Sequence, residues 1–175
     1  MPKRLAALIV LIMVVAGLGA GCAPSHYKHQ VPFDEADYAP YAGAGTAVIT
    51  GTAVVTLKDG KTIAASNEFV FLIPGTAYSR EWFENEILAD HRIEGVDPRS
   101  LRATRSVTTD TEGRFTFSNV PPGDYYLTCS VAWENPSFNI RRLKVNKGLA
   151  STLAYATVRV GQGEQVSILV TRPIP

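Results

Sequence analysis

The strongest structural signal in the chain lies at residues 106–131, whose sequence is SVTTDTEGRFTFSNVPPGDYYLTCSV. Apolar and aromatic residues alternate there with polar ones at the period of two that indicates half-buried β-strands. Asp110 and Gly113 stand first and fourth in a run of four, as a type I turn prefers. We therefore predict a hairpin, in which the strand that ends near Thr109 turns back into a strand at residues 114–118.

The second half of this stretch predicts another turn and another strand. Pro122 fixes φ for the second position of a type II turn, and Gly123 supplies the positive φ of the third. The next strand then begins at Tyr125. On the strand between the two turns, the period of two places Phe115 and Phe117 together, and we expect both rings to face inward.

Similar signals continue on both sides of this stretch. Residues 47–57 and 67–73 alternate in the same way, and Asp59-Gly60 between them is a strong hairpin turn. Two last strands are expected at residues 151–160 and 165–171. About seven strands favour an all-β fold, a single seven-stranded Greek-key β-sandwich at residues 46–175. Two groups of residues are expected to share a face: Ile49, Ala53, Val55 and Leu57, and then Phe69, Phe71 and Ile73.

One segment of this domain, at about residues 79–105, departs from the strand pattern. Ser79 is followed by acidic residues, and Phe83 and Ile87 lie on one helical stripe, so residues 79–88 are expected to form a short helix. Asp97-Pro98 is expected to cap a second turn. Inserted loops on a rigid scaffold are where binding residues concentrate. The same helical insertion could equally serve as a lid that closes one end of the sandwich.

The run from Thr108 to Leu127 resembles the signature of carboxypeptidase regulatory-like domains, which are transthyretin-like sandwiches. Their pattern is a D-x-x-G turn, an F-x-F strand, a V-P-x-G turn and a Y-x-L strand, and these parts follow one another here in that order. Ile49–Val54 resembles the first strand of the family. The resemblance implies the fold and a role as an interaction or stabilising module, with carbohydrate-binding relatives, but no single function.

The first residues have the order of a bacterial lipoprotein signal peptide at 1–21. Two basic residues precede an apolar run at residues 5–15, which is short for a membrane-spanning helix, and small residues follow. The segment LGAGC at residues 18–22 resembles the lipobox, with Gly19 where that motif usually has a large aliphatic residue. We expect Cys22 to be acylated and to hold the chain in membrane lipid through several acyl chains.

The residues after Cys22 predict where the protein is anchored and how. Ala23 stands where an aspartate would favour retention in the inner membrane, so the resemblance to sorted lipoproteins implies the outer membrane. Residues 22–45 have several prolines and no apolar periodicity, and we expect this lipidated N-terminus to be a flexible tether. Its aromatic residues leave two alternatives, packing on its own domain or docking on another envelope protein. They are Tyr27, Phe33, Tyr38 and Tyr41.

Charge and cysteine content exclude two classes of protein. Without Lys3 and Arg4, the mature chain keeps 15 of its 17 basic residues against 16 acidic ones, so its formal charge is near −1. Nucleic acid is therefore not expected as a partner. Once Cys22 is acylated, Cys129 is the single remaining cysteine, which excludes a disulfide framework. Cys129 shares its strand face with Tyr125 and is interpreted as a buried, inert side chain.

The candidate contacts for a partner or a glycan form two groups. Three arginines of the insertion make a local basic stripe, which is typical of a solvated face, and the alternative is a contact with lipid headgroups or an acidic partner. Two tryptophans and a tyrosine could form a platform on which a sugar stacks, and the alternative is a role in the core or the lid. These candidates are Tyr78, Trp82, Arg99, Arg102, Arg105 and Trp133.

His91 and Glu94 reproduce the H-x-x-E spacing with which zinc carboxypeptidases hold their metal. Those enzymes need a third, distant histidine and a much larger domain, whereas His26 and His29 lie in the tether. The sequence also contains no nucleophile elbow, phosphate loop or calcium loop. We therefore expect no metal site, no cofactor and no catalytic residues.

An anchor, a tether, a rigid domain and the lack of a reactive cluster lead to two hypotheses. The first is a non-enzymatic, lipid-anchored envelope protein that acts as a structural or accessory module and binds another envelope protein. The second is a carbohydrate- or peptidoglycan-binding lipoprotein. Both hypotheses place the chain at the outer membrane, facing either the periplasm or the cell surface.

Overall fold

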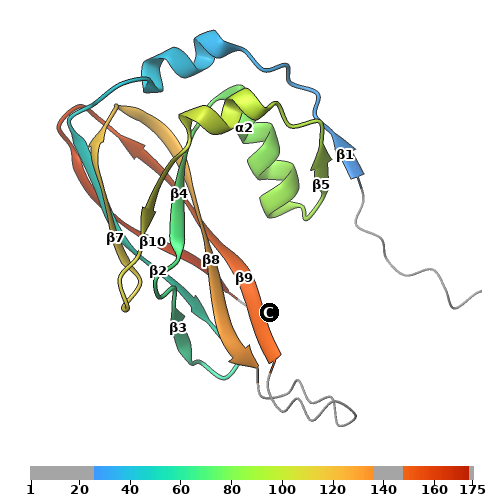
Figure 1. The fold of residues 1–175 in the computed structure, drawn as a ribbon, viewed down its shortest axis with the longest axis vertical. Coiled ribbons are helices and arrows are strands. Elements are labelled where there is room, and N and C mark those ends of the chain that lie inside the picture. The colour runs from blue at the N-terminus through green and yellow to red at the C-terminus, as the bar shows by residue number, and fades with distance from the viewer. Residues whose placement is uncertain (1–25, 136–147, 174–175) are drawn as a thin grey trace, which may run out of the picture.

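The computed structural model describes residues 26–135 and 148–173 (Figure 1). The predicted signal peptide and the predicted acylation site at Cys22 lie outside these ranges. Within them, no helix is both long and apolar enough to cross a bilayer. Most of the described chain forms one curled β-sheet, and the helical elements gather at one end of it (Figure 1).

The main sheet contains eight strands. They pair in the order β3-β2-β10-β9-β8-β4-β6, and β7 also pairs with β2. β10 is parallel to β2, and the other pairs of this sheet are antiparallel. The structure is mostly β, as predicted: the sheet curls into a half-barrel, which is compatible with a β-sandwich, and the seven-stranded Greek-key topology stays a prediction for these strands. Their bounds are β2 (Ala47–Thr56), β3 (Thr62–Ala64), β4 (Phe69–Pro74), β6 (Arg105–Thr108), β7 (Arg114–Val120), β8 (Gly123–Asn135), β9 (Gly148–Val160) and β10 (Gln165–Pro173).

The inner face of the curled sheet holds the core. Ile49 and Leu127 are fully buried there, and Phe115 and Phe117 face inward as predicted, with exposed fractions of 5% and 1%. Cys129 belongs to the same cluster, and burial raises the pKa of its thiol to about 12. Because the thiolate is the reactive form, the predicted inert role of this cysteine agrees with its surroundings.

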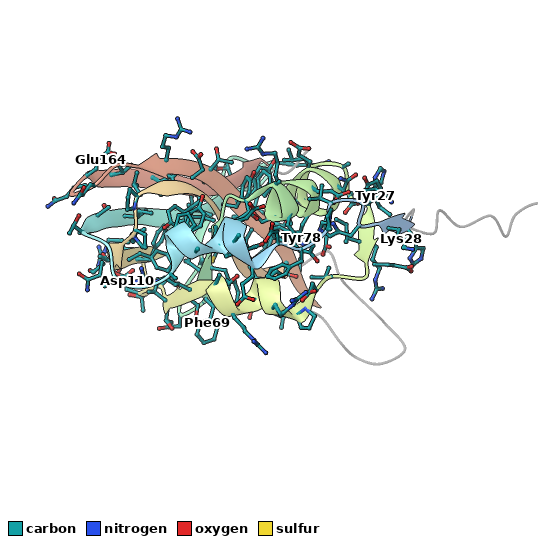
Figure 2. The ribbon with its side chains drawn as sticks, turned by 90° about the horizontal axis from the view of Figure 1, so that it is seen from above. Tyr27, Lys28, Phe69, Tyr78, Asp110 and Glu164 are labelled. Carbon is teal, nitrogen blue, oxygen red and sulfur yellow. The ribbon has the colours of Figure 1, made fainter. Side chains whose placement is uncertain are left out.

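β4 turns its aromatic residues away from the core. Phe69, Phe71 and Ile73 share a face, as predicted, but this face is the outer one. Val70 and Leu72 fill the core instead, and Phe69 and Phe71 are 58% and 42% exposed. Figure 2 shows Phe69 projecting from the body of the molecule. The alternating pattern therefore predicts which residues share a face of the strand, but it does not predict which face is buried.

The two predicted hairpins have different outcomes. Asp59-Gly60 joins β2 to β3, which pair antiparallel, and Gly60 adopts the positive φ expected of it. The turn from Asp110 to Gly113 also forms, with the Gly113 N–H donating to the Asp110 carbonyl at 3.1 Å. The hairpin predicted around that turn is wrong, because β6 pairs with β4 whereas β7 pairs with β2. The turn carries the chain from one edge of the curled sheet to the other.

The insertion between β4 and β6 is helical, as predicted. It contains α2 (Ala77–Trp82), the π-helical turn η3 (Phe83–Leu88) and the 3-10 helix η4 (Pro98–Ala103). α2 begins earlier than expected because its N-cap is Thr76, whose hydroxyl accepts from the Ser79 N–H. The predicted apolar stripe of η3 is buried, and Asp97 caps η4 as expected.

Residues 26–45 lie across the same end of the sheet, and we call them the N-terminal strap (Figure 1). The strap contains β1 (His26–Lys28), which pairs in parallel with β5 (Arg92–Glu94) of the insertion, and the 3-10 helix η2 (Glu35–Tyr41). Within η2, Tyr38 is 7% exposed. Of the two alternatives for its aromatic residues, the structure has them on the protein's own domain, so this part of the expected tether is not a free coil.

Candidate functional site

A hollow of about 220 Å³ opens between the outer face of β4 and the insertion. We call it the apolar hollow, because most of its surface is apolar. Phe71 and Ile73 of β4 form one wall, Trp82 of α2 stands in the facing insertion, and Leu101 of η4 adds an exposed apolar side chain. Such a hollow can hold the apolar face of a ring-shaped ligand.

Local sequence explains how these walls come together. The period of two along β4 sends Phe71 and Ile73 outward. The capping box formed by Thr76 and Ser79 then starts α2 directly after the strand, so the chain turns back over the outer face of β4. The Ser79 hydroxyl also donates to the carbonyl of Pro74, the last residue of β4. This link fixes the direction in which α2 leaves the sheet.

Tyr38 of the strap also lines the apolar hollow and carries an unpaired polar group. Its hydroxyl is buried and makes no hydrogen bond of normal geometry among the described residues, although the side chains of Thr76 and Ser79 are close enough to act on it. Burial raises the pKa of Tyr38, and these two side chains act in the other direction. A buried hydroxyl without a partner costs about 1–3 kcal/mol. Because the hydroxyl oxygen is out of reach of solvent, the part of Tyr38 that lines the hollow is its ring.

A second hollow, of about 530 Å³, lies between η4 and the strap. We call it the basic hollow, because Arg99, Arg102 and Arg105 all line it, with Glu35 as the acidic residue of the lining. Residues three apart eclipse one another in a 3-10 helix, so Arg99 and Arg102 share one side of η4. Tyr38 lines this hollow as well as the apolar one, so the two hollows adjoin at its ring.

The three guanidinium groups of the basic hollow differ in their partners. Arg99 forms a fork on Asp97, with Nε–Oδ1 and Nη2–Oδ2 distances of 3.0 and 2.7 Å, and lies 4.6 Å from the centre of the Phe33 ring. These hydrogen bonds lower the pKa of Asp97 to about 2. Arg105 donates to two carbonyls of β7, at 2.6 and 3.0 Å. Arg102 makes no hydrogen bond or ion pair within the described ranges.

Glu81 of α2 holds the strap in place over both hollows. Its side chain is 8% exposed, and its carboxylate accepts hydrogen bonds from the backbone N–H groups of Gln30 and Val31, each at 2.8 Å. The Tyr27 hydroxyl donates to the same carboxylate at 2.9 Å, and His29 forms an ion pair with it. A buried carboxylate with this many donors is stable only while the strap is docked.

Five of the six candidate contact residues lie around these two hollows, and one does not. Trp133 is five residues along β8 from Thr128, the residue of this strand that lines the apolar hollow, which is roughly 17 Å at the rise of a strand, and Trp133 packs partly against the core. Tyr78 is 4% exposed, and its ring stacks on that of His29 with 3.8 Å between the ring centres. It therefore forms part of the wall of the hollow and is not an exposed surface on which a sugar could stack. Figure 2 shows Tyr78 inside the body of the molecule. The members of the hollows are Tyr78 and Trp82 in the apolar one, and Arg99, Arg102 and Arg105 in the basic one.

Several residues of the site are absent from the sequence-based candidates, and Phe33, Tyr38 and Phe71 are the aromatic ones that the argument uses. The aromatic content of the strap indicated that Phe33 and Tyr38 could pack on another surface, but it did not predict where the strap docks. The alternation along β4 grouped Phe71 with Ile73 but did not place that face outside. Each of these positions depends on contacts between segments far apart in the chain.

The residues with a zinc-like spacing have other partners. His91 is half-buried, and Glu94 pairs with His26, with an Nδ1–Oε1 distance of 2.7 Å. Among the residues that the structure describes, no group of three or more His, Cys, Asp or Glu side chains could hold a metal ion.

Comparisons with known proteins include a solved structure that resembles most of this chain. No family model matches the chain, and no curated protein matches it. The crystal structure of a "putative carbohydrate binding protein" from Pseudomonas aeruginosa is similar, with a TM-score of 0.66 and 26% identity over 82% of this chain and 100% of that chain. A 9R-lipoxygenase from Cyanothece matches over 94% of this chain and 20% of its own, with 13% identity and a TM-score of 0.30, which is too low to support an argument.

Proposed function

We propose that this chain is a non-catalytic glycan-binding protein of the bacterial envelope and that the apolar hollow receives a sugar ring. The observation that carries the proposal is the aromatic wall of the hollow, to which β4 and α2 each contribute a ring. Trp82 and Phe71 offer surfaces for the apolar face of a sugar. The name of the similar Pseudomonas protein agrees with this class of ligand.

Glycan binding can be tested with an array of bacterial and peptidoglycan-derived oligosaccharides. We expect the protein to retain at least one class of glycan and Phe71→Ala to lose about tenfold or more in affinity, because stacking on an aromatic ring contributes on the order of 1–2 kcal/mol. Phe69→Ala is the matched control, since Phe69 lies on the same outer face of β4 but does not line the hollow. Retention of no glycan, or equal losses in both variants, would refute the proposal.

The anchoring at Cys22 is part of the same proposal. The signal peptide and lipobox described above support acylation of Cys22 and delivery to the outer membrane. We expect Cys22→Ala to abolish incorporation of labelled palmitate and to leave the precursor uncleaved. Palmitate incorporation in this variant would show that the lipobox assignment is wrong.

A protein partner in the envelope is the second candidate function. Phe69 and Leu101 are large apolar side chains with exposed fractions of 58% and 65%, and large exposed apolar groups are common at interfaces. Crosslinking in intact cells, followed by purification in mild detergent, would test it. Recovery of the bait without any specific partner across growth conditions would count against this role.

A further inference from the structure

We infer that the glycan is acidic: its carboxylate binds beside Arg102 in the basic hollow while the neighbouring sugar ring lies in the apolar hollow. This inference rests on the proposed glycan-binding function and adds the chemical class of the ligand. It does not follow from the fold or from the name of the similar protein, since neither specifies a charge. It follows from how η4 divides the two hollows.

η4 presents different side chains to its two sides. Leu101 lines the apolar hollow, whereas Arg99 and Arg102 line the basic one. Tyr38 lines both, so one ligand can extend across its ring from one hollow into the other. A single apolar pocket with a neighbouring cationic one fits a sugar unit that carries a negatively charged group at one end.

The charges around the basic hollow favour a group with a single negative charge. Three arginines line the hollow, Glu35 lines it too, and Asp97 forms an ion pair with Arg99 beside it. Three positive charges against two negative ones leave one positive charge. A carboxylate supplies one negative charge, whereas a phosphate monoester carries about −1.5 to −2 at neutral pH. A carboxylate therefore matches this charge better than a phosphate monoester.

The partners of the arginines indicate which one meets the ligand. Arg99 is held by Asp97 and Phe33, and Arg105 by the carbonyls of β7, so both are fixed before any ligand arrives. Arg102 has no ion pair within the described ranges, and a guanidinium fork matches the two oxygens of a carboxylate. The small residues Ala39 and Gly43 on the facing strap leave room for the ligand's polar group.

The experiment compares oligouronates, such as oligogalacturonate and oligoglucuronate fragments, with the same oligosaccharides after reduction of their carboxyl groups. A phosphorylated oligosaccharide provides a third arm. We measure the affinity of the full chain, of Arg102→Gln and of Lys58→Gln by titration calorimetry at low and high salt. Lys58 is the matched control because it is exposed in the turn between β2 and β3 and lines neither hollow.

We expect the uronates to bind more tightly than their reduced forms and to weaken with salt. Arg102→Gln should lower the affinity for the uronates roughly tenfold, as for one charge-assisted hydrogen bond, and leave the reduced forms within about twofold. Lys58→Gln should change neither. Equal binding of acidic and reduced forms, or a preference for the phosphorylated form, would overturn the carboxylate inference while leaving glycan binding intact. Failure of every oligosaccharide to bind would remove both proposals.

Discussion

Two buried side chains of this protein, Tyr38 and Glu81, carry polar groups, and the consequences of their burial differ. Tyr38 buries a hydroxyl that has no partner among the described residues, so its polarity is a cost in the ligand-free protein. Glu81 buries a carboxylate that has several donors, so its polarity stabilises the docked strap. The first arrangement costs stability, and the second holds the strap on the domain.

Replacing Tyr38 with phenylalanine separates the contribution of its hydroxyl from that of its ring. Tyr38→Phe keeps the ring that lines both hollows and removes the unpaired hydroxyl. We expect the free energy of unfolding to stay equal or to rise by up to about 1 kcal/mol, because a buried unpaired group is removed. Affinity for the glycan should change little, because the ring that lines both hollows is kept. Urea denaturation and glycan titration of the same preparation measure the two effects, and a destabilised variant would show that the hydroxyl has a partner.

The carboxylate of Glu81 gives a prediction on pH. Burial alone would raise its pKa, but hydrogen bonds from the N–H groups of Val31 and Gln30, with help from Tyr27 and His29, lower it below the ordinary value of 4.5. A group whose pKa is lower in the folded state stabilises the fold above its unfolded pKa, and this stabilisation is lost as the pH falls through the folded pKa. The docked strap should therefore weaken in acid.

Glu81→Gln tests this sign. At pH 7 we expect the variant to lose about 2–4 kcal/mol of unfolding free energy, because a charged acceptor of backbone N–H groups is replaced by a neutral amide. Near pH 3 the difference from the natural protein should shrink. Glu84→Gln, an exposed neighbour, should change stability by less than about 0.5 kcal/mol. A difference that is the same at both pH values would contradict the role of the ionised carboxylate.

Elements of this fold are short, and their ends are fixed by side chains. The insertion shows this most clearly, since α2 and η4 each span only six residues and neither would be stable alone. Thr76 and Ser79 begin α2, and Asp97 begins η4 by accepting from the Arg99 N–H at 2.9 Å. These caps set where Trp82 and Arg102 stand, so the caps determine the two hollows.

Thr76→Ala removes the N-cap hydroxyl of α2. We expect a loss of about 1–2 kcal/mol in unfolding free energy, because the Ser79 N–H loses its acceptor at a buried helix end. Trp82 should also become less ordered, which intrinsic fluorescence can detect as a red shift. Thr76→Ser, which keeps the hydroxyl, is the control. A variant with unchanged stability would mean that packing alone starts the helix.

The whole molecule joins a curled sheet, an insertion and a strap, and only the sheet has a large core. The core cluster runs from β2 to β10, and of the strap only Tyr41 packs against it. The strap is held instead by Glu81, by the β1–β5 pair and by the contact of Tyr41 with Tyr125. We therefore regard the strap as a separate layer that completes both hollows.

Deleting residues 26–44 tests this view. We expect the sheet to fold and to keep its far-ultraviolet circular dichroism, because its core does not depend on the strap. The melting temperature should fall by several degrees, since the hydrogen bonds between Glu81 and the strap and the pairing of β1 with β5 are lost. Glycan binding should be lost together with Tyr38. Undiminished binding by the shortened chain would show that the strap is not part of the site.

The sequence by itself determined the features that depend on neighbours in the chain. Alternation located most of the strands and the inward rings of Phe115 and Phe117, and turn chemistry located Asp59-Gly60 and the turn at Asp110. The sequence also located the helical insertion and the three arginines of its basic stripe. These features follow from backbone sterics, side-chain periodicity and local hydrogen bonds, which act within a few residues.

Only the tertiary structure decided which surfaces are covered and which segments meet. β6 and β7 leave their shared turn for opposite edges of the sheet, Phe71 faces outward, and Trp133 lies far from Trp82. Tyr38 reaches both hollows because Glu81, more than forty residues away, binds the strap. The physical reason is that a period of two defines two faces of a strand without saying which one is buried, and that choice depends on contacts between distant segments.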